Sequence, residues 1–364
     1  MAPAGAPSTA VGALCLAPPP RRIAVFRALY LGDLLCATPA FRALRGRFPD
    51  AEFTLIGLPW ARDFVARSPA LDRLEVFPGY PGIAEAAHDP ARTATFLARA
   101  RAARYDLVIQ LHGSGVTSNG FVAALGARET LGYRAGDDGR LTASLAYDDG
   151  EHEILRWLRL VALAGATTDM ALEYPRTPAD EARADALLAP LAGPGPLVGL
   201  HPGARDPDRR WPADRFATLA GALAARHGAR LVLTGAAGER PLTAAVRDAL
   251  TAPALDLAGA TDLGTLAAVL ARLDLFVGNN TGPIHLAVAV GTPSVMLAGP
   301  GRADCWVPLD RSRHRVVDAR RLAPPGADEA AALRQLPVAP VLATCERALA
   351  ARRAGQLASA AAGL

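Results

Sequence analysis

The chain has 364 residues, of which 51% are hydrophobic and 20% are charged, a composition typical of a soluble globular protein. A chain of this length is long for one hydrophobic core, so we expect two domains. The formal net charge of +4 is small and the basic residues, all of them arginine, are scattered, so nucleic-acid binding is not indicated.

The first segment, residues 1–20, is rich in alanine and proline but has no early positive charge and no uninterrupted apolar core. We therefore interpret it as a disordered leader and not as a signal peptide. The cysteines lie far apart and form no CxxC pair, which argues against a zinc site or disulfides and favours a cytoplasmic location. No stretch of about 20 apolar residues is present that could span a membrane.

Strands alternate with helices through residues 21–175, which we expect to form the first domain. A strand at residues 22–26 is followed by a helical pattern that begins at Asp33 and that Pro39 should kink near its start. Further strands are predicted at residues 52–56, 74–77 and 106–111, and helices at 59–66, 91–103 and 151–164, with another strand–helix pair before the last helix.

Residues 176–196 are proline-rich around a short helix and are interpreted as the connection between two domains. The second domain is predicted at residues 197–335, followed by a C-terminal helix and tail at 336–364. Its strands are predicted at 197–200, 230–233, 255–257, 273–277 and 294–298, and its helices at 214–226, 262–273 (capped by Thr261), 284–290 and 338–352. The repeated β-α order predicts an α/β fold with two doubly wound domains that face a cleft, with ligands at the carboxyl ends of the strands.

The most distinctive stretch is LDLFVGNNTGPIHLAVAVGTPSVMLAGP, residues 273–300. A polar, glycine-bearing turn at 278–282 follows a buried strand, and Pro283 suits the first turn of the helix after it. Such a helix start presents free N–H groups and the positive end of the helix dipole, so it can hold a phosphate. The stretch is neither GxGxxG nor a Walker loop, and an ordinary turn of an α/β protein explains it as well.

Two acidic pairs, Asp137-Asp138 and Asp148-Asp149, invite a metal interpretation because adjacent carboxylates can chelate a divalent cation. Each pair is followed directly by glycine, and Asp-Gly is a strong turn signal. We therefore favour solvated turns over metal ligands.

Polar groups stand at several predicted strand-to-helix turns: Asp33, Arg209 with Arg210, Glu239, and Asn280-Thr281-Gly282. In a doubly wound fold such turns open on one edge of each sheet, so these groups can converge on a shared cleft. A cation, carboxylates and a helix start together suit a nucleotide-diphosphate ligand.

Four stretches in this order also resemble a known family: GDLLCATPAFRALRGRFPDAEF, HPGARDPDRRWPADRFATLA, LTGAAGE and NNTGPIHLAVAVGTPSVMLAGP. They look like the successive signatures of glycosyltransferase family 9, the ADP-heptose:lipopolysaccharide heptosyltransferases, which have the GT-B fold. The resemblance covers roughly residues 22–300. It implies two Rossmann-like domains, a nucleotide-diphosphate sugar as donor and a glycan or glycolipid as acceptor.

The resemblance implies a role for each matching residue. Asp33 matches the aspartate proposed as the base that accepts the proton of the acceptor hydroxyl. Glu239 matches an acidic residue that bonds the ribose hydroxyls, and Arg209 stands where the family usually has a phosphate-binding lysine. Arginine keeps that charge and can contact phosphate through two N–H groups.

Thr281, Gly282 and Ile284 match the turn and helix start that hold the pyrophosphate in the family. His285 matches a histidine that is common in the same motif, although a packing role is the more frequent one for such a residue. Asn280 replaces the aspartate that is usual in heptosyltransferases, which removes a negative charge near the donor and leaves the sugar open.

Other roles are open for several of these residues. Gly32, His112 and Ser114 are candidates for the acceptor side, but a turn at a strand end explains His112 and Ser114 as well. Asp33 has the alternative role of a carboxylate favoured at a helix start by the dipole, and Glu239 that of a solvated loop charge.

The function expected from these residues is that of an inverting, metal-independent glycosyltransferase without a cofactor. It would act in the cytoplasm, with contact to the inner membrane face if the acceptor is a glycolipid. Two alternatives share the architecture: a sugar-nucleotide epimerase, which needs no acceptor, and a non-catalytic protein that binds a sugar nucleotide.

Overall fold

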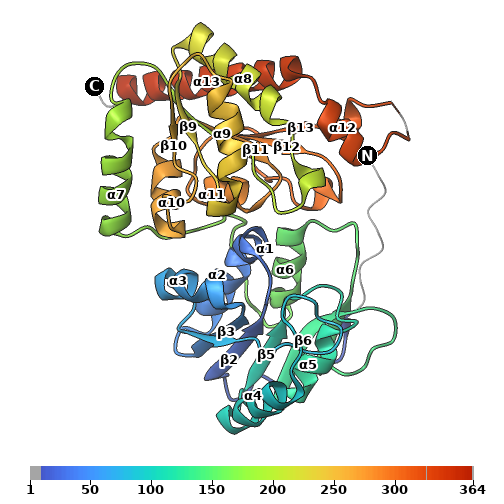
Figure 1. The fold of residues 1–364 in the computed structure, drawn as a ribbon. Coiled ribbons are helices and arrows are strands. Elements are labelled where there is room, and N and C mark those ends of the chain that lie inside the picture. The colour runs from blue at the N-terminus through green and yellow to red at the C-terminus, as the bar shows by residue number, and fades with distance from the viewer. Residues whose placement is uncertain (1–9, 325, 363–364) are drawn as a thin grey trace. The chain divides into compact units, whose positions relative to one another are not determined.

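The computed structural model describes residues 10–324 and 326–362 and divides into two compact units, Met1–Ala171 and Leu172–Leu364 (Figure 1). Each unit is built on its own, largely parallel sheet. The predicted α/β class with two Rossmann-like domains is thereby confirmed. None of the described helices combines the length and apolar character needed to cross a membrane.

The first unit holds a seven-stranded sheet in the order β1-β7-β6-β5-β2-β3-β4. Its strands are β1 (Ala10–Val11), β2 (Arg22–Phe26), β3 (Glu52–Gly57), β4 (Arg73–Val76), β5 (Leu107–Gln110), β6 (Glu129–Arg134) and β7 (Ala143–Ala146). Its helices are α1 (Leu31–Cys36), α2 (Thr38–Arg47), α3 (Arg62–Arg67), α4 (Pro90–Ala103), α5 (Ser118–Ala124) and α6 (Glu153–Ala162), with a 3₁₀ turn at Pro59–Ala61. Val25 and Phe26 are consecutive and both fully buried, so both faces of β2 are covered.

The start of the chain differs from the expected disordered leader in the part that the structure describes. β1 pairs antiparallel with β7, and the Arg128 Nη2 donates to the Pro18 carbonyl at 3.1 Å. The other strand pairs of this sheet are parallel. β7 would otherwise be an edge strand with unpaired backbone groups, which β1 covers. Residues 1–9 of the expected leader lie outside the described residues.

The helical pattern expected from Asp33 onward is divided into two helices where a kink was predicted. α1 ends at Cys36, and α2 begins at Thr38 with Pro39 in its first turn. A proline lacks an N–H and fits a first turn, so the chain restarts a helix there instead of bending one. The separate α1 places Asp33 in its own first turn, directly after the β2 loop.

The second unit holds a six-stranded parallel sheet in the order β10-β9-β8-β11-β12-β13. Its strands are β8 (Leu197–His201), β9 (Arg230–Leu233), β10 (Ala254–Asp256), β11 (Leu275–Asn279), β12 (Ser294–Ala298) and β13 (His314–Asp318). Its helices are α7 (Pro178–Leu188), α8 (Ala213–His227), α9 (Arg240–Asp248), α10 (Leu263–Ala271), α11 (Gly282–Ala289), α12 (Glu329–Gln335) and α13 (Val338–Ala362). Phe276 and Val277 point to opposite faces and are both fully buried, so helices cover both faces.

Several predicted elements need correction. The N-cap of α10 is Asp262 and not Thr261: the Asp262 Oδ1 accepts from the Thr265 N–H at 2.7 Å. Where a strand–helix pair was expected after β5, α5 is followed by the parallel strands β6 and β7. β13, α9 and α12 were not predicted; each is a short element of nine residues or fewer.

The proline-rich segment between the two predicted domains contains α7, which packs on α10 of the second unit. Arg272, just after α10, anchors it through ion pairs to Glu181 and, at 2.6 Å, to Asp185. The C-terminal segment is anchored to the same unit by Trp211, whose Nε1 donates to the Leu336 carbonyl at 2.8 Å.

Candidate active site

In the second unit, the carboxyl ends of β8 and β11 are joined by the side chain of Asn279. Its Oδ1 accepts from the Trp211 N–H at 3.0 Å, and its Nδ2 donates to the carbonyls of Pro202 (3.0 Å) and Gly203 (3.2 Å). Asn279 is fully buried. A buried amide with these bonds fixes the β8 loop against the turn that follows β11. Asn279 is not among the residues predicted from the sequence. A polar residue at the end of an apolar strand is the signal that could have indicated it.

The turn after β11 leads into α11, whose N-cap is Thr281. The N–H of Asn280 donates to the Leu297 carbonyl at 3.0 Å, and that of Ile284 donates to the Thr281 carbonyl at 3.1 Å. Pro283 has no N–H. Among the described residues, no acceptor contacts the N–H of Thr281 or Gly282, so these two groups are the ones that α11 can offer to an anion.

The two residues that follow this turn are buried. The Ile284 side chain is fully buried, so it supports the helix start by packing. His285 is also buried and lies edge-on to Trp306, with ring centroids 6.4 Å apart. Their side chains therefore shape the core beneath the turn.

Glu239 ends the short 3₁₀ turn Ala237–Glu239 after β9. Its Oε2 accepts from the Ala236 N–H at 2.8 Å and lies 3.9 Å from Nε2 of His201. A Cβ at position 203 would collide with this carboxylate, so the glycine there makes room for it. The Glu239 carboxylate is thus fixed next to the β8 loop by the Ala236 N–H of its own turn, and it is not fully solvated.

His201 itself is a buried residue at the end of β8. Its Nδ1 lies 3.1 Å from the Thr234 hydroxyl. Burial lowers its pKa below the ordinary value, and the Glu239 carboxylate opposes that shift only in part. A neutral imidazole here acts as a support for the loop that carries Gly203.

Arg209 and Arg210 differ in their contacts. The Nε of Arg210 donates to the Ala204 carbonyl at 2.8 Å, which ties down its own loop. Arg209 is exposed at the end of the 3₁₀ turn Pro207–Arg209, with its guanidinium over Gly301. Its side chain makes no hydrogen bond or ion pair with another described residue. Of the two arginines, Arg209 is therefore the one available to an anion.

In the first unit, Asp33 lies in the first turn of α1 and is partly buried. Its Oδ2 accepts from the Tyr30 N–H at 3.1 Å. Burial raises the pKa of this carboxyl above its ordinary value; Arg27 and the Tyr30 hydrogen bond oppose the shift, and the charge of Glu153 adds to it. Besides the N–H groups of Tyr30 and of Asp33 itself, no described residue donates to this carboxylate, so it can accept a further proton or hydrogen bond.

The backbone of Asp33 is fixed by Arg27, which directly follows β2 and is 1% exposed. The Nε of Arg27 donates to the Asp33 carbonyl at 2.8 Å, and its Nη1 donates to the Leu111 carbonyl at the end of β5. Its Nη2 lies 3.1 Å from Oε1 of Glu153. One buried guanidinium therefore connects the α1 turn, the neighbouring strand end and α6.

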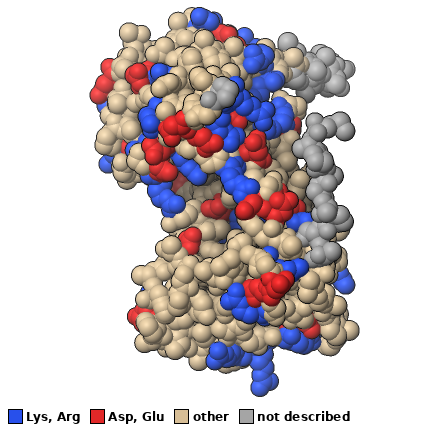
Figure 2. Space-filling model, turned by 90° about the vertical axis from the view of Figure 1, so that its right-hand side faces the viewer, with Lys and Arg blue, Asp and Glu red and all other residues tan. Residues whose placement is uncertain are grey.

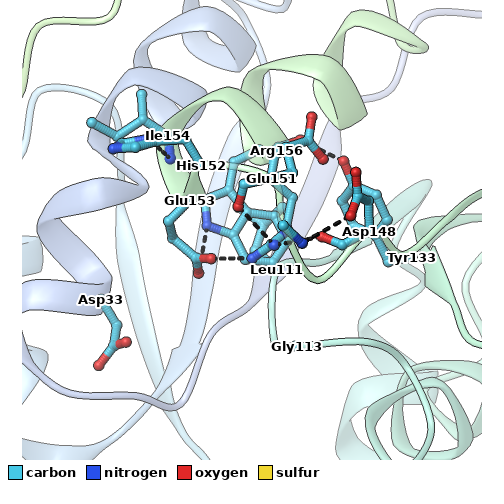
Figure 3. A network of polar contacts seen from close by, with 12 residues as sticks. Asp33, Leu111, Gly113, Tyr133, Asp148, Glu151, His152, Glu153, Ile154 and Arg156 are labelled. Carbon is cyan, nitrogen blue, oxygen red and sulfur yellow. Dashed lines mark hydrogen bonds and ion pairs between the residues drawn. The ribbon is translucent and has the colours of Figure 1, made fainter. Parts of the chain in front are cut away.

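Figure 3 shows how this network continues from Glu153 into α6 and the loop before it. Glu153 pairs with Arg156 through Oε2 and accepts from the Trp157 indole at 3.1 Å through Oε1. The Nη2 of Arg156 donates to the carbonyls of Asp148 (2.7 Å) and Glu151 (2.9 Å). Glu153 thus lies between two buried arginines, an arrangement that requires each partner to keep its charge.

The acceptor-side candidates lie near this network in the same unit. The Nδ1 of His112 accepts from the Ala28 N–H at 3.3 Å, so the neutral ring carries its proton on Nε2, 3.6 Å from Oε2 of Glu85. The ring stacks on Phe26 with centroids 4.7 Å apart. Ser114 lies partly buried in the turn after β5, and Gly32 is the second residue of α1.

The acidic pairs serve as turns. Asp138 accepts from Arg140 (2.7 Å) and Asn119 (2.8 Å), and these hydrogen bonds, chiefly that of Arg140, lower its pKa to about 2. The Asp148 Oδ1 accepts from the Gly150 N–H at 2.8 Å. Throughout the described part of the chain, no group of three or more His, Cys, Asp or Glu residues could hold a metal ion.

The chain is a glycosyltransferase: residues 94–328 match the model of "Glycosyltransferase family 9 (heptosyltransferase)", and the chain belongs to this family. It is 27% identical over 326 residues to "Lipopolysaccharide heptosyltransferase 2" of Salmonella typhimurium, which covers 81% of this chain and 87% of that protein.

Two solved structures share the fold. The "ADP-heptose lps heptosyltransferase II" of E. coli has a TM-score of 0.72 at 22% identity, with 90% of this chain and 98% of that chain covered. The "E. coli heptosyltransferase WaaC with ADP" has a TM-score of 0.66 at 20% identity, with 90% and 99% covered.

Proposed function

We propose that this glycosyltransferase moves heptose or a related sugar from an ADP-linked donor to a hydroxyl of a lipopolysaccharide-type glycolipid, with inversion at the anomeric carbon. The observation that carries the proposal is the Asp33 carboxylate: its pKa is raised by burial, one oxygen accepts from Tyr30, and the carboxylate can accept a further proton. The names of the heptosyltransferase relatives suggest the sugar and the acceptor.

The reaction would be a single displacement. The acceptor oxygen forms a bond to the anomeric carbon as the bond from that carbon to the diphosphate breaks, and Asp33 takes the proton of the acceptor hydroxyl. A carboxylate of raised pKa is the better base for this step. Arg27 fixes the backbone beneath Asp33, which favours one position for the base.

The leaving diphosphate gains negative charge as the bond breaks. Arg209, with no partner among the described residues, and the N–H groups of Thr281 and Gly282 supply positive charge and donors to it. Because these groups can stabilise the charge that develops on the diphosphate, we propose that no metal ion is needed. Glu239 would bind the ribose hydroxyls from the β9 end.

The donor sugar is the less constrained part of the proposal. Asn280 stands where heptosyltransferases usually have aspartate, and it follows the last residue of β11 directly. The side-chain amide of Asn280 can accept a hydrogen bond from a sugar hydroxyl but carries no charge. We therefore include sugars related to heptose as donors. A glycolipid acceptor would bring the protein to the cytoplasmic face of the membrane.

One experiment separates this function from its alternatives. The purified protein is incubated with ADP-heptose, with and without a truncated lipopolysaccharide acceptor, and ADP release is followed. ADP released only with the acceptor supports a transferase, whereas a changed donor sugar without acceptor indicates an epimerase. A protein that binds the donor but does neither is a binding protein. Loss of activity in EDTA that magnesium restores would overturn the metal-independent step.

A further inference from the structure

A pocket with a volume of about 690 Å³ lies in the second unit, between the edge strand β13 and α13. It shares no lining residue with the donor residues discussed above. Its charged lining consists of Arg311, Arg315, Arg321, Arg347, Asp304 and Asp318. Figure 2 shows basic side chains gathered over the upper part of the molecule, with acidic ones among them.

Both carboxylates of the pocket already have partners. Asp318 lies 2.8 Å from Nη2 of Arg320, and Asp304 lies 3.4 Å from the same atom. Arg321 approaches the same two carboxylates, at 3.2 Å from Asp304 and 3.4 Å from Asp318. The two acids and these two arginines therefore balance one another.

The other three arginines of the lining have no such partner. In the described part of the chain, Arg311, Arg315 and Arg347 form no ion pair; Arg347 only donates to the Thr344 hydroxyl, at 2.9 Å. The Nε of Arg315 is buried without a hydrogen-bond partner. Burial and the nearby Arg321 lower the pKa of Arg311, and the carboxylates of the pocket offset this only in part. An uncompensated guanidinium cluster of this kind stabilises a bound anion.

Apolar side chains complete the walls. Val307, Val316, Pro340 and Ala343 line the pocket, and Leu322 at its edge is 56% exposed. A site with guanidinium groups on one part of its wall and apolar groups on another suits an organic phosphate and not a bare ion.

We propose that this pocket is a second anion site, which binds the phosphoryl group of a phosphate compound with an apolar part. Such a group comes either from the headgroup of an anionic lipid or from a soluble phosphate ester. The inference stands apart from the proposed sugar transfer, because none of its residues belongs to the donor or acceptor sites.

The test compares the double variant Arg315→Gln/Arg347→Gln with Arg353→Gln. Arg353 is an exposed arginine on the same helix that does not line the pocket, so it controls for lost charge. Phenyl phosphate, a phosphate ester with an apolar part, is titrated calorimetrically, and binding to vesicles of phosphatidylglycerol and of phosphatidylcholine is measured by co-sedimentation. All variants keep the donor residues, so a difference between them reports on the pocket whether or not the transferase assignment holds.

We expect the double variant to lose at least about tenfold in affinity for one of the two anionic probes, since two charge-assisted contacts are removed. Loss toward phenyl phosphate identifies a soluble ligand, and loss confined to phosphatidylglycerol vesicles identifies a lipid headgroup. The proposal is overturned if the double variant binds both probes as the wild type does, or if Arg353→Gln weakens binding equally. Should the double variant melt at a markedly lower temperature, the exposed single variant Arg347→Gln gives the same comparison.

Discussion

The replacement Asp33→Asn tests the proposed base directly. Asparagine keeps an oxygen that can accept from the Tyr30 N–H, now 3.1 Å from Asp33 Oδ2, but it cannot take a proton. A positioned base commonly contributes about 10²–10⁴-fold to the rate. At about 1.4 kcal/mol for each factor of ten, that corresponds to a barrier raised by about 3–5 kcal/mol. Turnover should fall by that factor, whereas ADP affinity, which depends on second-unit residues, should stay near wild type.

Asp33→Asn should not lower the free energy of unfolding, and this expectation follows from the pKa of Asp33. Burial raises that pKa in the folded protein, so the folded state binds more protons than the unfolded chain as pH passes between the unfolded and the folded pKa. Stability contributed by protonated Asp33 is therefore lost as pH rises through this window. Above it, the buried charge opposes folding. The asparagine side chain carries no charge, so at pH 7 the variant should be at least as stable as the wild type.

Three measurements decide the matter: the rate of ADP release with acceptor, ADP affinity by calorimetry, and the melting temperature at pH 7. The reasoning is refuted if turnover barely changes, in which case His112, at the end of the neighbouring strand, becomes the next candidate. A fall in ADP affinity together with turnover would instead assign Asp33 to donor binding. Asp33→Ala is the control for the hydrogen bond to Tyr30, and loss of that cap should lower stability by about 0.5–2 kcal/mol.

Substitutions at three further residues test the supporting groups. Arg209→Ala should weaken ADP binding and slow turnover together, since a lost charge-assisted contact is worth about 1.5–3 kcal/mol, whereas Arg209→Lys should keep much of the activity; wild-type kinetics in the alanine variant would remove Arg209 from the site. Glu239→Gln should lower ADP affinity several-fold at an unchanged melting temperature, because glutamine still accepts from Ala236; unchanged affinity would contradict ribose binding. Glu153→Gln should lower the free energy of unfolding in urea by about 3–5 kcal/mol, because it leaves two buried arginines unpaired. It should also move the acid limb of the pH–rate profile to lower pH, since Glu153 raises the pKa of Asp33; an unmoved limb would argue against that coupling.

The local pattern of the sequence determined much of this protein. Apolar runs closed by glycine, proline or acidic residues predicted most strands and helices, because period and turn chemistry act over a few neighbouring residues. β12 has the bounds that were expected, and α11 begins within two residues of its predicted start. The positions of Asp33, Glu239 and the α11 turn at strand ends follow from the β-α order, since parallel strands end at one edge of a sheet.

Only the tertiary structure decided which groups support these residues. Glu153 is 126 residues from Arg27, and Asn279 is 77 residues from Pro202, yet each pair is joined by a buried bond. The pairing of β1 with β7 and the arginine pocket beside β13 are equally non-local. The local periodicity of the sequence does not indicate such partners. A buried charge or amide is satisfied by whichever polar group the fold brings within about 3 Å. The sequence shows that these residues are polar, and the fold selects which of them meet.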